Sequence, residues 1–255
     1  MGKENNVKDF FVDLADTIRR KVGDKVDENL VDIIDDIPRY KPKNMATIIE
    51  NNIKKEFFGG FFEDVVCVDG TGINAIEKIT VYKECGTIKE GAYKNLKNLK
   101  TVEIEDGVTE VGKDAFRECS SIEAITFPQS VWSIQSGAFF VTLGKGNLKT
   151  VKFEGNEDGV VIKSQAFQLC YNLQTVYIEN VKTIEGLAFQ VLQKLYLNND
   201  SVGGVTISPS AFSGNLPTIY VRDELVENWR ALINSSFEEG KRPTIKGFSE
   251  EINNQ

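Results

Sequence analysis

The sequence predicts an α+β solenoid: similar windings stacked on one another, a parallel β-sheet along one side, short helical turns, and a small α-helical region before the stack. The first observation is a pair formed by an alanine and an aromatic residue, which returns at intervals of 23, 23, 28, 22 and 23 residues. The second is an apolar triplet that recurs with the same period. Such a period is typical of repeats that bury their apolar faces against neighbouring copies. The aromatic residues are Tyr93, Phe116, Phe139, Phe167, Phe189 and Phe212.

The triplet has the spacing Leu-x-x-Val-x-Ile and predicts one short strand in each winding. Its last two apolar positions are separated by one residue, which is the period of a strand with one buried face. Stacking would align these strands in a parallel sheet with the triplets inside. The triplets are Ile76/Ile79/Val81, Leu99/Val102/Ile104, Ile122/Ile125/Phe127, Leu148/Val151/Phe153, Leu173/Val176/Ile178, Leu192/Leu195/Leu197 and Leu216/Ile219/Val221.

A second extended segment is predicted on the opposite side of each winding, because an apolar residue lies four positions before each alanine. The Ala-aromatic pair is then predicted to begin a helical turn with its ring inside, since a side chain larger than alanine would collide with the next winding. Gly144, Lys145 and Gly146 predict a loop inserted in the longest interval. The apolar residues before the alanines are Ile88, Val111, Ile134, Ile162, Ile184 and Ile207.

The repeat resembles the BspA-like branch of the leucine-rich repeats. The resemblance rests on VTEVGKDAFRECSSIEAITFPQSV and IKSQAFQLCYNLQTVYIENVKTIEGLAF and covers residues 76–221. It implies a right-handed, arc-shaped solenoid of a kind commonly exposed on microbial surfaces and associated with adhesion. The segment TIYVRDELVENWRAL resembles the usual ending of that family, a last strand followed by a helix. Tyr93 departs from the phenylalanine usual at its position.

The ends of the chain differ from the repeats. Residues 1–56 are predicted to form helices: one through Phe10, Leu14, Ile18 and Val22, a second over residues 30–37, and a third that begins at Asn44 and carries Ile48, Ile49 and Ile53. The stretch LADTIRRKVGDKVDENLVDIIDDI resembles the helical opening of tail-associated proteins of phages and prophages. This resemblance implies a phage-tail or cell-surface carrier bound through residues 1–56.

Caps are predicted at both ends of the stack, because terminal repeats otherwise expose core and strand edges. Residues 57–86 are predicted to form a linker and an N-terminal cap, in which Phe57, Phe58, Phe61 and Phe62 cover the first winding of the repeats at 87–222. Residues 223–255 are predicted to form a cap helix and a tail. In this helix, Asp223 is the expected N-cap, and the buried stripe is Leu225, Trp229, Leu232 and Ile233.

Composition narrows the function classes. The 255-residue chain has a net charge of −8, and without a cluster of basic residues it does not suit nucleic acid. Neither a bilayer-spanning apolar stretch nor a secretion signal is visible, so we expect no membrane insertion and, unless a carrier exports it, a cytoplasmic location. The chain has no histidine and no phosphate-binding glycine motif. We therefore expect no cofactor and no enzymatic activity, although a carboxylate pair remains an alternative.

The four cysteines and one acidic loop are the candidates for special sites. Cys119 and Cys170 lie two windings apart, about 10 Å at strand spacing, whereas a disulfide needs Cα atoms within about 7 Å. They are predicted to be buried thiols, while Cys67 and Cys85 are either thiols or a bridge. The loop at 154–159 carries three carboxylates, which are either calcium ligands or an ordinary solvated loop.

The candidate binding site is the outward row of the predicted sheet, since strand side chains alternate between the two faces. Tyrosines on three successive strands predict an amphipathic ladder for a protein or glycan ligand, because the ring packs while the hydroxyl stays wet. The alternative is that these tyrosines only stabilise the strands. The candidate residues are Tyr177, Tyr196, Tyr220, Glu103, Thr126 and Lys152 in the first row, and Glu179 and Arg222 in the next.

Three functions remain open from the sequence. The first is a non-enzymatic recognition and adhesion module on a bacterial surface or a phage-like particle, which binds protein or glycan through the sheet. The second is an intracellular scaffold for protein–protein interaction. The third is a hydrolase that uses a carboxylate pair.

Overall fold

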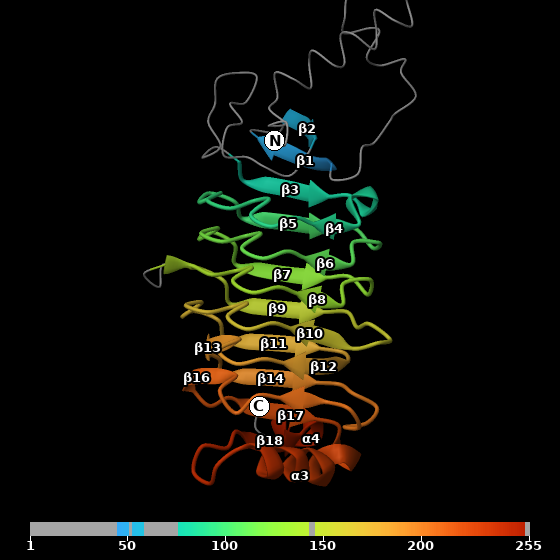
Figure 1. Cartoon of the computed structure of the whole chain (residues 1–255), viewed down its shortest axis with the longest axis vertical. Helices are drawn as coiled ribbons and strands as arrows, with labels where there is room; N and C mark the ends of the chain where they lie inside the picture. The colour runs from blue at the N-terminus through green and yellow to red at the C-terminus, as the bar shows by residue number, and fades with distance from the viewer. Residues whose placement is uncertain (1–44, 51–52, 59–75, 143–145, 253–255) are drawn as a thin grey trace, which may run out of the picture.

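The computed structural model describes residues 45–50, 53–58, 76–142 and 146–252. These residues form a solenoid whose windings are stacked along its long axis (Figure 1). Each winding contributes one strand to a first series and, in six windings, one short strand to a second series. The prediction of stacked windings with parallel strands is confirmed.

The first series forms the wide side of the solenoid, and we call its solvent-facing surface the sheet face. With one exception, between Ile104 and Ala124, neighbouring strands of this series pair in parallel with no shift of register, for example Tyr177 with Tyr196 and Tyr196 with Tyr220. The strands are β3 (Lys78–Val81), β5 (Thr101–Ile104), β7 (Ala124–Phe127), β9 (Thr150–Phe153), β11 (Thr175–Ile178), β14 (Lys194–Leu197), β17 (Thr218–Val221) and β18 (Thr244–Gly247).

The second series forms one continuous six-stranded parallel sheet, which we call the second sheet. Its six predicted apolar residues, from Ile88 to Ile207, are at most 2% exposed. The second extended segment of each winding is therefore confirmed. The strands are β4 (Thr87–Ile88), β6 (Glu110–Val111), β8 (Ser133–Ile134), β10 (Val160–Ile162), β12 (Val181–Ile184) and β15 (Thr206–Ile207).

The aromatic rings of the repeat form a continuous column inside the solenoid, which we call the aromatic column. Successive rings stack with centroids 5.1–5.4 Å apart from Tyr93 to Phe189 and 6.2 Å apart from Phe189 to Phe212. The column continues to Phe237, which lies beyond the repeats recognised in the sequence. Every alanine before a ring is at most 2% exposed, as expected where a larger side chain has no room.

The segments around the rings are hydrogen-bonded turns, so the predicted helical turns are wrong. From Tyr93 to Phe189, the backbone N–H of the ring residue donates to the alanine carbonyl of the next winding, as Phe116 does to Ala138 at 2.7 Å and Phe167 to Ala188 at 2.9 Å. A donor used between windings cannot also sustain a helix within one winding. In the last windings this ladder becomes the paired short strands β13 (Phe189–Val191) and β16 (Phe212–Asn215).

The N-terminal end is covered by a β-hairpin, and the helix predicted from Asn44 is wrong. Strands β1 (Met45–Glu50) and β2 (Ile53–Phe58) pair in antiparallel fashion, and β1 also pairs with β3. The spacing of Ile48, Ile49 and Ile53 suits a helix, but pairing with the open edge of the first winding satisfies backbone groups that a helix would leave exposed there. The helices predicted within residues 1–44, the rings of Phe57 and Phe58, and Phe61 and Phe62 lie outside what the structure describes.

The C-terminal end contains the predicted cap helix and an unpredicted strand. Helix α3 (Val226–Ser236) buries Trp229 and Ile233, as expected. Strand β18 follows it, pairs with β17, and leads into α4 (Phe248–Ile252). Asp223 is not the N-cap of α3, because it starts the short 3₁₀ helix η4 (Asp223–Leu225) and its carboxylate instead accepts hydrogen bonds from Ser249.

The first series is interrupted between β5 and β7, which belong to two separate sheets. At the register position after the strand, Glu105, Glu154 and Asn198 each donate a backbone N–H to the preceding winding. Pro128 occupies that position after β7 and has no N–H to donate. Ile104 is half-buried where its equivalents in the other strands are buried. The wide side is thus split, whereas β6 and β8 remain paired on the second sheet.

Candidate functional site

The structure places the predicted first outward row in register along the sheet face. Thr126 pairs with Lys152, Lys152 with Tyr177, and the three tyrosines follow in successive strands. Lys246 in β18 extends this row beyond Tyr220. Glu103 pairs with Thr80 and lies across the interruption from Thr126. The row therefore joins six of these positions and leaves Glu103 in the separate N-terminal sheet.

The three tyrosine rings stack on one another and form what we call the tyrosine row. The centroids of Tyr177 and Tyr196 are 4.6 Å apart at an interplanar angle of 17°, and those of Tyr196 and Tyr220 are 4.9 Å apart at 13°. Stacking occupies both ring faces of Tyr196, so this residue presents its ring edge and hydroxyl to the outside. The row therefore carries a line of phenolic hydroxyl groups rather than a broad aromatic platform, and the hydroxyl of Tyr196 is bonded to Glu251.

Exposure falls steeply along the tyrosine row. Tyr177 is 40% exposed, Tyr196 is half-buried, and Tyr220 is 8% exposed. The expectation that all three face solvent is therefore wrong for Tyr220. The buried end of the row lies where β18 and α4 follow, and the side chain of Lys194 also reaches over it, with Nζ 6.0 Å from the ring centroid of Tyr220.

Helix α4 contacts the tyrosine row through Glu251. Its carboxylate oxygen Oε1 accepts a hydrogen bond from the Tyr196 hydroxyl and lies 2.7 Å from Lys194 Nζ. Burial favours the neutral acid, but the bonds from Lys194 and Tyr196 outweigh it and lower the pKa of Glu251. Conversely, the bond to Glu251 raises the pKa of Lys194, while burial and then the same carboxylate raise the pKa of Tyr196. All three groups thus hold the charge states that favour this contact at neutral pH.

The second outward row is tied together by polar contacts. Asn198 Nδ2 donates to Glu179 Oε2 at 2.7 Å, and Arg222 Nε donates to Asn198 Oδ1 at 2.7 Å. Arg222 also forms an ion pair with Asp200 at 2.7 Å. Pro128, at the corresponding position after β7, is buried. Glu179 and Arg222 therefore lie beside the tyrosine row but are engaged with each other through Asn198.

An open groove of about 570 Å³ lies on the sheet face at the interruption between β5 and β7. Three carboxylates line it, and each has a lysine nearby: Lys78 at 2.5 Å from Glu103, Lys149 at 3.0 Å from Glu123 and Lys152 at 3.8 Å from Glu154. The hydrogen bond from Lys78 lowers the pKa of Glu103, so this group is a poor proton donor near neutral pH.

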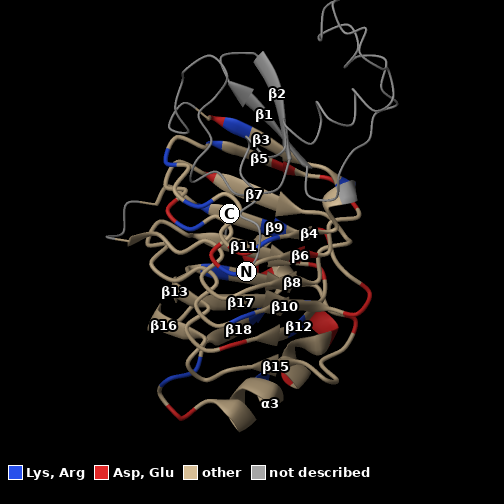
Figure 2. Cartoon of the chain, turned by 45° about the horizontal axis from the view of Figure 1, so that its top comes forward, with Lys and Arg blue, Asp and Glu red and all other residues tan. Residues whose placement is uncertain are grey.

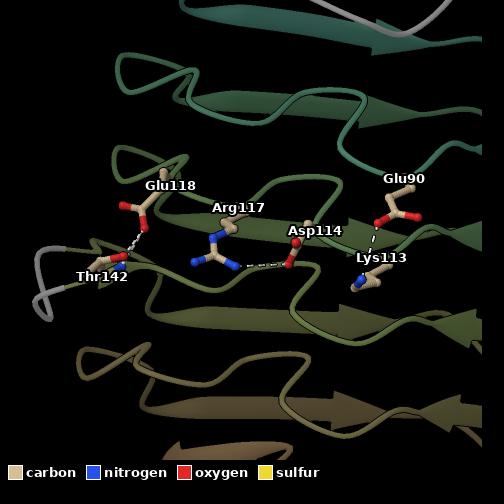
Figure 3. A network of polar contacts seen from close by, with 6 residues as sticks. All are labelled: Glu90, Lys113, Asp114, Arg117, Glu118 and Thr142. Atoms are coloured by element: carbon tan, nitrogen blue, oxygen red, sulfur yellow. Dashed lines mark hydrogen bonds and ion pairs between the residues drawn. The ribbon is translucent and has the colours of Figure 1, made fainter. Parts of the chain in front are cut away.

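The hydrogen-bonded turns around the aromatic column form a separate surface of the solenoid, which we call the turn side. It carries polar side chains that contact one another. Lys113 pairs with Glu90 at 3.3 Å, and Arg117 lies 3.5 Å from Asp114 (Figure 3). Glu118 accepts hydrogen bonds from the backbone and side chain of Thr142 in the next winding. Basic and acidic segments are interspersed along the described windings (Figure 2). The Lys113–Glu90 and Thr142–Glu118 contacts connect neighbouring windings, whereas the Arg117–Asp114 pair lies within one winding.

The cysteines inside the repeats are structural. Cys119 and Cys170 are free and buried, and their thiols lie 3.0 and 3.1 Å from the carbonyl oxygens of Tyr93 and Phe139 in the preceding windings. Burial raises the pKa of both thiols to about 12, which makes the reactive thiolate rare at neutral pH. Cys85 is also buried, and Cys67 lies outside the described residues.

The acidic loop at 154–159 is organised by asparagine. Asn156 accepts the backbone N–H of Asp158 and donates to the carbonyl of Gln129, and Asn180 donates to the carbonyls of Asn156 and Glu157. Within the part of the chain that the structure describes, no three side chains of the types His, Cys, Asp and Glu gather as metal ligands. Among the same residues, no helix is long and apolar enough to cross a bilayer.

Three residues at this site were not predicted from the sequence: Lys194 and Lys246 on the strands of the sheet face, and Glu251 on α4. A signal for β18 was present, because Pro-Thr-Ile occurs at 217–219 and again at 243–245, each time at the start of a strand. The second copy has Arg242 where the first has Leu216, and its strand ends in Gly247 where the first ends in Val221, so the triplet pattern did not detect it. Glu251 reaches the site from another element, which no repeat pattern encodes.

Comparison with known proteins supports the repeat assignment. Residues 72–196 match the family model described as BspA type Leucine rich repeat region, in six copies. The solved structure titled "The Crystal structure of Pneumococcal vaccine antigen PcpA" superposes with a TM-score of 0.52 at 17% identity, over 67% of this chain. The chain spans only 41% of that antigen. No curated protein matches the sequence.

The structure confirms the parallel solenoid, and the match to the BspA type extends over residues 72–196. The resemblance of residues 14–37 to phage-tail proteins receives no support from the comparisons, and those residues lie outside the described part of the chain.

Proposed function

We propose that this protein is a non-enzymatic recognition module of the adhesion type, which binds a protein or glycan partner through its sheet face. The observation that carries the proposal is the row formed by Lys152 and the three tyrosines, where an exposed aromatic ring adjoins an exposed cation on a parallel sheet. Tyrosine is favoured at interfaces because it contributes a large contact area together with a hydrogen-bonding group.

Several features support recognition rather than catalysis. The groove on the sheet face is open, and its three carboxylates lie near lysines, as in an ordinary charged surface. The similarity in fold to a pneumococcal vaccine antigen, and the match of the repeats to the BspA type, agree with a module displayed on a bacterial surface. A carrier bound through residues 1–56 remains part of this proposal.

The experiment that tests the proposal uses two tyrosines that are equally exposed on different faces. Tyr177 on the sheet face is 40% exposed, and Tyr171 on the turn side is 43% exposed. The full chain is screened against arrays of extracellular proteins and glycans, and each hit is measured again with Tyr177→Ser and Tyr171→Ser. We expect Tyr177→Ser to weaken binding at least tenfold, or about 1.4 kcal/mol, and Tyr171→Ser to leave it unchanged. Binding that depends only on Tyr171 would place the partner on the turn side and refute the proposal.

A further inference from the structure

The contact between α4 and the sheet face contains a complete carboxylate site. The acceptor is Oε1 of Glu251, and its donors are the ammonium group of Lys194 and the hydroxyl of Tyr196. Both donors come from β14, where one residue separates them, so they project from the same side of one strand. Bonds from a cation and a phenol to one carboxylate oxygen are of the charge-assisted kind, which is stronger than a neutral pair.

The segment that fills this site is small and lightly held. Helix α4 has five residues, which is too short to be stable by itself. Its anchors include polar contacts: Ser249 donates to Asp223 from its backbone and hydroxyl, and Glu250 accepts the N–H of Gly247. Phe248 is half-buried, and Ile252 is 76% exposed. Little apolar burial therefore opposes the release of α4.

Three lysines lie along the tyrosine row, although the whole chain is acidic and Lys152 also lies 3.8 Å from Glu154. Lys152 and Lys246 stand at the two ends of the tyrosine row, and Lys194 projects beside it. Within the row itself the groups between these cations are phenols, which donate hydrogen bonds and carry no charge near neutral pH. A ligand with carboxylates spaced along an extended segment matches this alternation of cations and donors.

The stacking of the tyrosines favours a peptide over a sugar as the ligand. Sugar rings bind aromatic residues through an open ring face, but both faces of Tyr196 are covered by Tyr177 and Tyr220. What remains at Tyr196 is the hydroxyl, and the group seated on it is the side chain of a short acidic segment, Phe-Ser-Glu-Glu-Ile.

We propose that Lys194 and Tyr196 form a recognition site for a carboxylate of an acidic peptide segment on a partner protein, and that α4 occupies this site with Glu251 until the partner displaces it. This inference rests on the proposed function of the sheet face and identifies its ligand class. Helix α4 then acts as a competitor within the chain, which lowers the apparent affinity for the partner by the fraction of time that the site is filled.

The test uses a labelled peptide with the sequence Gly-Phe-Ser-Glu-Glu-Ile, copied from residues 247–252, and a matched peptide with glutamine in place of both glutamates. Binding to the full chain is followed by fluorescence anisotropy at low salt. We expect Glu251→Ala to bind the acidic peptide about fivefold more tightly than the unchanged chain, because the internal competitor has lost its carboxylate. Adding Lys194→Gln or Tyr196→Phe to Glu251→Ala should remove this gain.

The controls separate site chemistry from general charge. Glu238→Ala removes another carboxylate, which pairs with Lys241 in the segment between α3 and β18, and it should change nothing. Thermal unfolding of each variant verifies that it is folded. Equal binding by the unchanged chain and Glu251→Ala, or equal binding of the two peptides, would overturn the inference. So would binding of polygalacturonate, an acidic glycan, by Glu251→Ala without binding of the acidic peptide.

Failure of the carboxylate site can be distinguished from failure of the proposed function. A partner from the arrays whose binding depends on Tyr177, but is unaffected by Lys194→Gln and Glu251→Ala, would leave the sheet face as the binding surface and refute only the carboxylate site. Loss of dependence on both Tyr177 and Lys194 would refute both proposals.

Discussion

The aromatic column inside the solenoid and the tyrosine row on its sheet face share one geometry in opposite surroundings. Rings stack at 5.1–5.4 Å along most of the column and at 4.6–4.9 Å in the row. The winding repeat imposes this spacing, because neighbouring strands lie about 4.8 Å apart. Stacking by itself is therefore no sign of a binding site. The difference lies in the groups beside the rings. The rings of the column lie inside the solenoid next to buried alanines, whereas the tyrosines of the row have hydroxyl groups and lie beside lysines on the sheet face.

The two also differ in continuity. The column passes through every described winding from Tyr93 to Phe237, whereas the sheet on the wide side is interrupted between β5 and β7. The interior contacts and the second sheet therefore hold the stack together where the outer strands do not. Single substitutions and solution measurements can test each side of this contrast.

The largest expected effect is in the column. Phe139 is 3% exposed and stacks at 5.1 Å on both Phe116 and Phe167, so Phe139→Ala should lower the free energy of unfolding by about 3–5 kcal/mol. Its neighbour Phe140 is half-buried beneath Arg117, and Phe140→Ala should cost at most about 1 kcal/mol. Denaturant unfolding of both variants measures the difference. Similar losses would show that the column is no more important than the surface.

The second effect is expected at the interruption. The N–H groups of Lys152, Tyr177 and Tyr196 point to the preceding strand, but the equivalent N–H of Thr126 faces β5, with which β7 does not pair. In native-state hydrogen exchange, the amide of Thr126 should therefore exchange at least about tenfold faster than the other three, equivalent to about 1.4 kcal/mol. Equal protection of all four amides would mean that the wide side is continuous in solution.

The contact between α4 and the row should depend on pH. A carboxylate whose pKa is lowered in the folded state stabilises that state above its ordinary value of 4.5, and this contribution is lost as the pH falls through the lowered value. The groups that face Glu251 are Lys194 and Tyr196, which do not titrate in this range. The ring signals of Tyr196 in NMR spectra should shift below pH 4.5, and the shift should disappear in Glu251→Gln. An unchanged spectrum throughout the acidic range would contradict the contact.

The smallest effect concerns the turn that leads into the column. Gly91, Gly137 and Leu187 occupy the same place, directly before the alanine, with φ of 65°, 67° and 60°. A left-handed backbone costs leucine about 1–2 kcal/mol, and glycine avoids this cost. Glycine also makes the unfolded chain more flexible, which cancels part of the gain in stability. Leu187→Gly should therefore stabilise the protein by about 0.5 kcal/mol, as measured by thermal unfolding. Leu187→Ala keeps the unfavourable conformation and should give no gain.

The features that recur were predictable from the sequence, and those that occur once were not. The triplets, the second apolar row and the Ala-aromatic pairs each describe the same environment several times, and nearly all of these side chains are buried. Leu216 is an exception at 40% exposure, because it belongs to the last triplet, where β18 and α3 replace a regular winding. The row of Lys152, Tyr177 and Tyr196 was predictable for the same reason, since strand alternation fixes the face.

Features that occur once depend on contacts that a repeat pattern does not encode. The burial of Tyr220 and the role of Glu251 depend on how α4 folds back across the strands, which is a contact between residues 55 positions apart in the sequence. Pro128 is visible in the sequence, but its effect on the pairing of β5 and β7 follows only from the neighbouring backbone. Residues 45–58 have an apolar spacing suited to a helix, but they form a hairpin because the edge strand of the first winding needs a pairing partner.

The divided wide side has a mechanical consequence. Between the windings of β5 and β7, resistance to stretching comes from the second sheet, the turn bonds and the stacked rings, while every later boundary adds a full set of strand bonds. A molecule pulled at its two ends would yield first at that boundary and lengthen there. The strands that carry the tyrosines are β11, β14 and β17, which lie C-terminal to this boundary. They would keep their pairing while the molecule lengthens at the boundary.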